Sequence, residues 1–157
     1  VRPHCPACAL ERAGVTLAIG TDGCASNNDL DMLGETRTAA LLAKAVANDA
    51  AGFNAHEALH AATLGGAKAM GFDHLVGSIE PGKQADLACV DLSALETQPL
   101  HNVVSQLIYA TGRHQVSDVW IAGAQKLRQR VLVDIDLDGV IANSRQWRER
   151  IAKVETA

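Results

Sequence analysis

The sequence predicts an α/β protein, with helices in the first half and short strands in the second. An apolar run over residues 15–19 carries the β-forming residues Val15, Leu17 and Ile19, with only Thr and Ala between them. Such a run is typical of a strand that is buried on both faces in a parallel sheet. Helical patterns follow this run, and short strand-like runs replace them beyond Gly77.

The predicted strand ends at an acidic residue, Asp22, with Gly20 and Gly23 close to it in the chain. In parallel α/β proteins the carboxyl ends of the strands carry the active site, so this acid is a candidate for catalysis or metal binding. A carboxylate enclosed there is costly unless it is paired, hydrogen-bonded or bound to a cation, and the glycines would permit a close ligand. Asp-Gly is also a common turn pair, so turn formation remains an alternative role for Asp22.

A helix is expected next, capped by Asn28 or Asp29 and extending to Ala47. The residues expected to form its inward-facing side are Leu30, Leu33, Leu41, Leu42 and Val46.

A second helix is expected to begin at Asn54, with Glu57 as its partner in a variant capping box, and to stop at Gly71. This helix places His56 and His60 four residues apart on one face, which is also the spacing of a metal-binding pair. The pattern around them is that of an ordinary packed helix, so we expect both histidines to lie at the surface or at its boundary.

The second half of the chain is expected to form strands over residues 87–92, 104–110, 116–122 and 126–133. The last two would be joined in a hairpin at Gly123, where glycine permits a positive φ. A final helix is expected over residues 139–154. Trp120 and Trp147 are expected to be core or domain-interface residues.

Two motifs resemble metal sites but lack essential ligands. Cys5 and Cys8 form a Cys-x-x-Cys pair, yet no second ligand pair follows at the spacing of a structural zinc site. Residues 134–139 match the first half of a calcium loop, but the twelfth position holds Arg instead of Glu. We therefore expect free thiols and a solvated strand-to-helix turn, with Asp138 as the helix cap.

Two longer motifs resemble those of the metal-dependent amidohydrolases. Residues 20–44, which begin GTDGCASNNDLDM, are similar to the eighth barrel strand, loop and helix of that superfamily. They are most similar to the 5-methylthioadenosine/S-adenosylhomocysteine deaminases and related chlorohydrolases. Residues 77–87, GSIEPGKQADL, are similar to the signature that marks the return to a small β-sandwich domain. The resemblance covers residues 5–152.

The resemblance implies part of a (β/α)8 metal-dependent hydrolase barrel. Residues 1–76 would supply its last strand and helices, residues 77–136 a segment of the β-sandwich, and residues 137–157 a C-terminal helix. A (β/α)8 barrel typically needs about 250 residues, so a chain of 157 cannot hold one together with a sandwich. We therefore expect the chain to be the C-terminal fragment of a longer enzyme, in agreement with its first residue being Val.

The function implied by the resemblance is hydrolytic deamination of an adenine nucleoside thioether. A divalent metal, with zinc expected, would activate the water that attacks the purine carbon. Asp22 would be the last metal ligand and would carry a proton from that water toward the leaving amine. Ser26, Asn27 and Asn28 follow on the loop as candidates for substrate contact, although they could equally cap a helix. The family's other ligands lie upstream of the motifs present, so we expect the isolated chain to be inactive and to bind metal weakly.

Two alternatives remain open. One is another amidohydrolase, such as a guanine or cytosine deaminase or an s-triazine chlorohydrolase. The other is a non-catalytic scaffold or oligomerisation module. The loop SNNDLDM, residues 26–32, favours the adenosine-thioether group. Exposed apolar edges of an incomplete barrel predict a homo-oligomer or self-association.

Composition points to a cytoplasmic protein, and the resemblance implies a small-molecule nucleoside as its partner. The formal net charge is −4, and the basic residues are scattered until the last third, which argues against nucleic-acid binding. The sequence has no signal peptide pattern and no run of 18 or more apolar residues, so no membrane association is expected.

Overall fold

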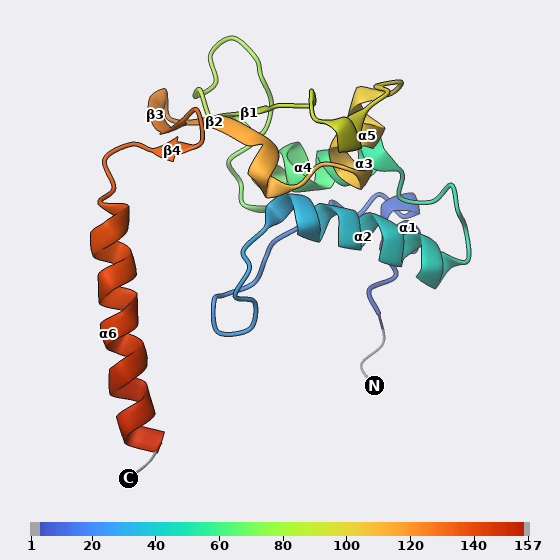
Figure 1. Ribbon diagram of the computed structural model, residues 1–157. Coiled ribbons are helices and arrows are strands. Elements are labelled where there is room, and N and C mark those ends of the chain that lie inside the picture. Colours follow the sequence, from blue (N-terminus) through green and yellow to red (C-terminus); the bar gives the residue numbers. More distant parts are fainter. Residues whose placement is uncertain (1–3, 156–157) are drawn as a thin grey trace.

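The computed structural model describes residues 4–155 of the chain. The helices are α1 (Ala7–Arg12), α2 (Met32–Ala47), α3 (Ala55–Ala62), α4 (Leu64–Ala69), α5 (Val103–Tyr109) and α6 (Leu137–Glu155), and the short 3-10 helices are η1 (Leu95–Thr97) and η2 (Arg113–Gln115). The strands are β1 (Leu87–Val90), β2 (Val116–Ile121), β3 (Ala124–Arg128) and β4 (Val131–Leu132). These strands form one antiparallel sheet in the order β1-β2-β3-β4. Figure 1 shows α1 to α5 gathered beside the sheet, while α6 extends away from them.

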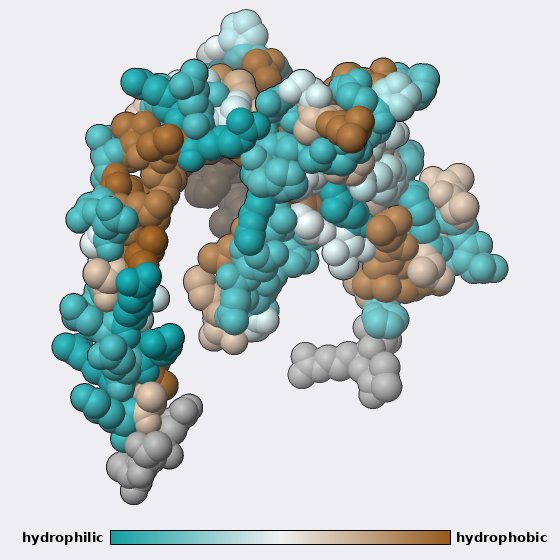
Figure 2. Space-filling view, viewed as in Figure 1, coloured by the Kyte–Doolittle hydropathy of each residue, from teal (hydrophilic) through white to brown (hydrophobic). Residues whose placement is uncertain are grey.

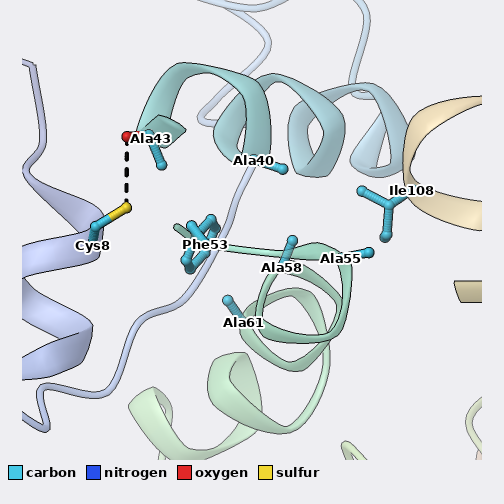
Figure 3. Close-up of a cluster of buried hydrophobic side chains, with 8 residues drawn as sticks. All are labelled: Cys8, Ala40, Ala43, Phe53, Ala55, Ala58, Ala61 and Ile108. Atoms are coloured by element: carbon cyan, nitrogen blue, oxygen red, sulfur yellow. Dashed lines mark hydrogen bonds between the residues drawn. The ribbon is translucent and has the colours of Figure 1, made fainter. Parts of the chain in front are cut away.

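The helical core is built mainly from small side chains. Because alanine projects little beyond the backbone, helices lined with it can pack at short interaxial distances. The largest buried aliphatic side chain is that of Ile108 on α5. The buried cluster, drawn in Figure 3, consists of Cys8, Ala40, Ala43, Phe53, Ala55, Ala58, Ala61 and Ile108.

The capping box predicted at the start of the second helix is confirmed. The side chain of Asn54 accepts hydrogen bonds from the backbone N–H groups of His56 (2.9 Å) and Glu57 (3.3 Å). The Glu57 carboxylate accepts the Asn54 N–H in return at 2.6 Å. The predicted single helix is divided at Thr63, where α3 ends and α4 begins, and Gly71 follows with φ of +74°.

The predicted cap of the preceding helix was wrong by two or three residues. Asp31, and not Asn28 or Asp29, caps α2, because its carboxylate accepts the N–H groups of Leu33 and Gly34, each at 3.1 Å. The side of α2 that is buried also differs from the predicted one. Leu41, Leu42 and Val46 are exposed and Leu30 precedes the helix in the loop, whereas Thr36, Ala40 and Ala43 form the buried side.

The segment 15–19 forms no strand in the described chain, contrary to the prediction. The segment is hydrogen-bonded to the helices at both ends: the Val15 N–H donates to the Leu10 carbonyl of α1 at 3.0 Å, and the Ile19 N–H donates to the Ala61 carbonyl of α3 at 3.3 Å. A parallel strand needs neighbouring strands at its sides, and residues 4–155 contain none that pairs with this segment. Val15 is consequently exposed instead of buried.

The run 104–110 was predicted to be a strand and is instead helix α5. Its β-forming residues indicated a strand, but Asn102 accepts the Ser105 N–H at 2.8 Å and thereby caps a helix. The helix then buries Ile108 in the core. A cap and a core contact together outweigh strand propensity, which depends strongly on context.

The strands predicted over 87–92 and 116–122 are confirmed as β1 and β2, and Gly123 forms the expected hairpin turn with φ of +81°. The strand predicted over 126–133 is in fact two short strands. Gln129 and Arg130 both have positive φ and reverse the chain, which pairs Leu127 with Leu132.

The final helix is confirmed as α6, which begins two residues before the expected start. Asp138 lies within its first turn and is not its cap. Trp147 was expected to be a core or interface residue, but it is 54% exposed and lies beneath the guanidinium of Arg150. Trp120 on β2 is half-buried. No helix in the part of the chain described by the structure is both long and apolar enough to cross a membrane.

Candidate functional site

The position of Asp22 depends on the helices that pack against the segment preceding it. Gly65 of α4 is buried against this segment, and a Cβ added there would lie 2.4 Å from the Leu17 carbonyl oxygen. Glycine therefore permits an approach that no other residue allows. Together with the hydrogen bond from Ile19 to Ala61, this contact directs the chain toward Asp22.

Asp22 itself is exposed and adopts a left-handed conformation, with φ of +60°. Aspartate is one of the few residues with a side chain that adopt this region readily. One carboxylate oxygen accepts the backbone N–H of Gly23 at 2.7 Å. This hydrogen bond, followed by one from Ser26, holds the pKa of the Asp22 carboxyl below its ordinary value. The side chain is therefore ionised at neutral pH, in the form that binds a cation.

The geometry shows the turn considered for Asp22 and is compatible with the ligand role. The Gly23 carbonyl accepts the N–H groups of Ser26 and Asn27, each at 3.0 Å, so a turn does follow the acid. The Asp22 carboxylate accepts the Gly23 N–H through Oδ1, and the residue remains exposed. An ionised, exposed carboxylate in such a turn is compatible with a ligand role. The enclosure expected for this carboxylate is absent within the described chain, where Asp22 is exposed.

Two of the three predicted substrate-contact residues hold the loop together. The Ser26 hydroxyl donates to the Gly23 carbonyl at 3.1 Å. The Asn27 side-chain amide donates to Glu35 at 2.8 Å, and its carbonyl accepts the Asp29 N–H at 3.1 Å. Asn28 is exposed, and its side chain makes none of these loop hydrogen bonds.

Three further residues organise this loop and were not identified from the sequence. Asp31 caps α2, and Glu35 holds Asn27 from the first turn of that helix. The spacing of an acid just before a helical pattern could have indicated Asp31. Arg113 contacts Asp29 from 84 positions further along the chain, a pairing for which the sequence contains no local signal.

The Asp22 carboxylate fits a metal site as one ligand, and such a site needs further ligands. Within residues 4–155, no group of three or more His, Cys, Asp or Glu side chains is arranged to hold a metal ion. Catalytic zinc sites use about three protein ligands, so the Asp22 carboxylate could be one of them.

The other candidate ligands lie elsewhere. Cys5 is exposed and Cys8 is buried, and both are free thiols. His56 and His60 are exposed, as expected, and line an open pocket of about 420 Å³ with Glu11. Burial, and next the neighbouring Glu57, raise the pKa of Glu11 above its ordinary value.

Residues 2–126 match the model of the amidohydrolase family. The chain belongs to the amidohydrolase family. It is 50% identical over 147 residues to the 5-methylthioadenosine/S-adenosylhomocysteine deaminase of Teredinibacter turnerae, an alignment that covers 94% of this chain and 33% of that enzyme. It therefore spans about one third of the length of the curated relatives that it matches.

Two solved structures extend the comparison. The first is an adenosine deaminase from Xanthomonas campestris with bound zinc, with 72% identity and a TM-score of 0.93, covering 95% of this chain and 34% of that one. The second is the atrazine chlorohydrolase of Arthrobacter aurescens complexed with zinc, with 30% identity and a TM-score of 0.82, covering 90% of this chain and 31% of that one.

Proposed function

We propose that this chain supplies a metal-binding carboxylate and a substrate-facing loop to a hydrolytic deaminase of adenine nucleoside thioethers, such as 5-methylthioadenosine or S-adenosylhomocysteine. The observation that carries the proposal is the state of Asp22, which is ionised and exposed after the segment 15–19. Hydrogen bonds from Ser26 to Gly23 and from Asn27 to Glu35 hold the loop that follows it. The identity to the deaminase of Teredinibacter turnerae supports the substrate class.

In this proposal the hydrogen bond from Gly23 orients the Asp22 carboxylate and keeps it ionised. A divalent metal, zinc by analogy with the zinc-bound relatives, would supply water of lowered pKa at neutral pH. Asp22 accepts a proton from the attacking water and delivers it to the departing amine. Asn28 contacts the substrate, while Ser26 and Asn27 hold the loop in place.

A test for the whole enzyme is a graft. In the grafted deaminase, the matched stretch of the Teredinibacter turnerae enzyme is replaced by this chain. We expect it to release ammonia from 5-methylthioadenosine, and we expect Asp22→Asn to lower kcat by about 100-fold or more, as for loss of a proton-transfer group. The matched control is Asp138→Asn, an exposed carboxylate in the first turn of α6, which should leave the rate unchanged.

The alternatives give different outcomes in the same assay. An s-triazine chlorohydrolase is favoured by the likeness to the Arthrobacter aurescens structure, and it would release chloride from atrazine instead of ammonia from the nucleoside. A guanine or cytosine deaminase would release ammonia from those bases alone. A scaffold or oligomerisation module would yield a folded graft that turns over none of these substrates.

The isolated chain should be inactive and should bind zinc weakly, because Asp22 needs ligands that residues 4–155 do not bring to it. Zinc content after gel filtration, together with deamination of 5-methylthioadenosine, measures both properties. One tightly bound equivalent of zinc, or any turnover, would overturn this part of the proposal.

Self-association of the isolated chain is also proposed. Leu41 and Leu42 of α2 are exposed, and apolar side chains gather along the first turns of α6 in Figure 2. Exposed apolar surface of this kind favours association. Sedimentation velocity over a range of concentrations should show species larger than the 16.5 kDa monomer, whereas a concentration-independent monomer would contradict the expectation.

A further inference from the structure

We propose that Arg113 is a positioning residue for the site, which holds the loop between Asp22 and α2 against the second half of the chain. This inference rests on the proposed function, because it assigns to Arg113 the placement of the loop that carries Asn28. The Arg113 guanidinium donates to the backbone carbonyl of Asp29 at 2.7 Å and also forms an ion pair with the Asp29 carboxylate.

The loop needs such a contact because its own conformation is not relaxed. Asp22 at its start and Leu30 near its end both have positive φ, and leucine seldom adopts that region. Conformations of this kind persist when surrounding structure imposes them. From the α2 side, Asn27 is held by Glu35. The contact from Arg113 holds the loop two residues further on, at Asp29, adjacent to Leu30.

The base from which Arg113 reaches the loop is itself fixed. Arg113 begins η2, whose last residue, Gln115, is buried and donates to the Asp91 carbonyl at 3.2 Å. Two residues before η2 begins, the carbonyl of the buried Thr111 accepts a hydrogen bond from Arg37 of α2 at 2.5 Å. The backbone around Arg113 is therefore hydrogen-bonded on both sides, through Gln115 to Asp91, which follows β1, and through Thr111 to Arg37 of α2.

The contact reaches the loop in two ways that can be separated by mutation. The bond to the Asp29 carbonyl fixes the backbone beside Asn28, whereas the ion pair uses the Asp29 side chain. Asp29→Asn removes the ion pair and keeps the carbonyl acceptor. Arg113→Ala removes both contacts, which share the nitrogen Nη1, and Arg113→Lys keeps the charge on the ammonium of a more flexible side chain.

The chain offers a closely matched control. Arg130 also donates to a backbone carbonyl, that of His114 at 3.0 Å, and also forms an ion pair, with Asp91 at 3.1 Å. Both arginine side chains are more than half exposed. Arg130 differs in that it contacts His114 of η2 and no residue of the loop, so Arg130→Ala removes a surface network of the same kind while the direct contact of Arg113 with Asp29 stays in place.

The experiment uses the grafted deaminase and two measurements. Hydrogen–deuterium exchange of the amides over residues 27–30 should accelerate about 3- to 10-fold in Arg113→Ala, as expected for an exposed ion pair combined with a charge-assisted hydrogen bond. Arg113→Lys and Asp29→Asn should give intermediate rates, and Arg130→Ala should leave these amides unchanged. The KM for 5-methylthioadenosine should rise by a similar factor in Arg113→Ala, with kcat nearly constant, because Asp22 is held separately through Gly23.

Two results would overturn the inference. One is loop exchange in Arg113→Ala that matches Arg130→Ala, and the other is a loss of kcat with no change in KM. If the graft turns over no nucleoside while the loop amides still exchange faster in Arg113→Ala, the positioning role of Arg113 is supported and the proposed reaction is contradicted. Global destabilisation of the variant would be recognised by faster amide exchange in α2 and α3 as well.

Discussion

The close approach of Gly65 to the segment before Asp22 makes a sharp test of how the site is positioned. In Gly65→Ala the new Cβ would lie 2.4 Å from the Leu17 carbonyl oxygen and 3.0 Å from that of His60. Both neighbours are backbone atoms, which cannot rotate away as a side chain would. The segment 15–19 must therefore move relative to α4.

The neighbouring Gly66 provides a matched control. A Cβ there would meet the Ala61 carbonyl oxygen at 3.6 Å, an ordinary contact distance. Replacing glycine by alanine inside a helix stabilises by up to about 1 kcal/mol, and this gain applies to both variants. Overpacking typically costs about 1–3 kcal/mol. We therefore expect the free energy of unfolding of Gly65→Ala to lie about 1–3 kcal/mol below that of Gly66→Ala.

Urea denaturation of the two variants, followed by circular dichroism, measures this difference. In the grafted deaminase, the same displacement should lower kcat/KM by up to about 100-fold in Gly65→Ala, since misplacement of catalytic groups by about 1 Å is costly. Equal stability and equal activity of the two variants would refute the reasoning that Gly65 places the segment leading to Asp22.

Three further predictions concern the body of the chain. Ile108→Ala should lower the free energy of unfolding by about 2–5 kcal/mol in urea denaturation, because the cavity would lie in a core made of small side chains. Asn54→Ala should cost about 1 kcal/mol in the same assay by removing the cap of α3, and an unchanged midpoint would contradict this. Hydrogen bonds from the side chain and backbone of Ser93, and then from Arg130, lower the pKa of Asp91 from 3.8 to about 2. The stabilisation from Asp91 is thus present above pH 3.8 and is lost as the pH falls toward 2, so the difference in urea midpoint between the wild type and Asp91→Asn should vanish at the acidic end.

Local signals in the sequence were sufficient where a local interaction decides the structure. The capping box of Asn54 and Glu57 and the hairpin at Gly123 were both predicted, because each depends on residues within four positions of one another. Asp22 was identified as a candidate site residue from an equally local pattern, an apolar run followed by a polar loop, and its role stays a prediction.

Predictions failed where contacts between residues far apart in the sequence determine the local structure. The run 104–110 has the composition of a strand, but burial of Ile108 against α2 and α3 favours a helix. The segment 15–19 has the pattern of a strand, but residues 4–155 contain no strand that pairs with it. Arg113 could not be found at all, because its partner Asp29 is 84 positions away and Arg113 itself belongs to no motif.

The packing between α1 and α2 gives the protein a chemical reporter of its own folding. Cys8 is buried with its thiol 3.6 Å from the Ala43 carbonyl, and Gly52 lies against the sulfur so closely that a Cβ there would be 2.9 Å away. Cys5, Cys24 and Cys89 are exposed. A thiol reagent should therefore modify three cysteines quickly, and the rate of the fourth modification measures how often α1 separates from α2, without any introduced label.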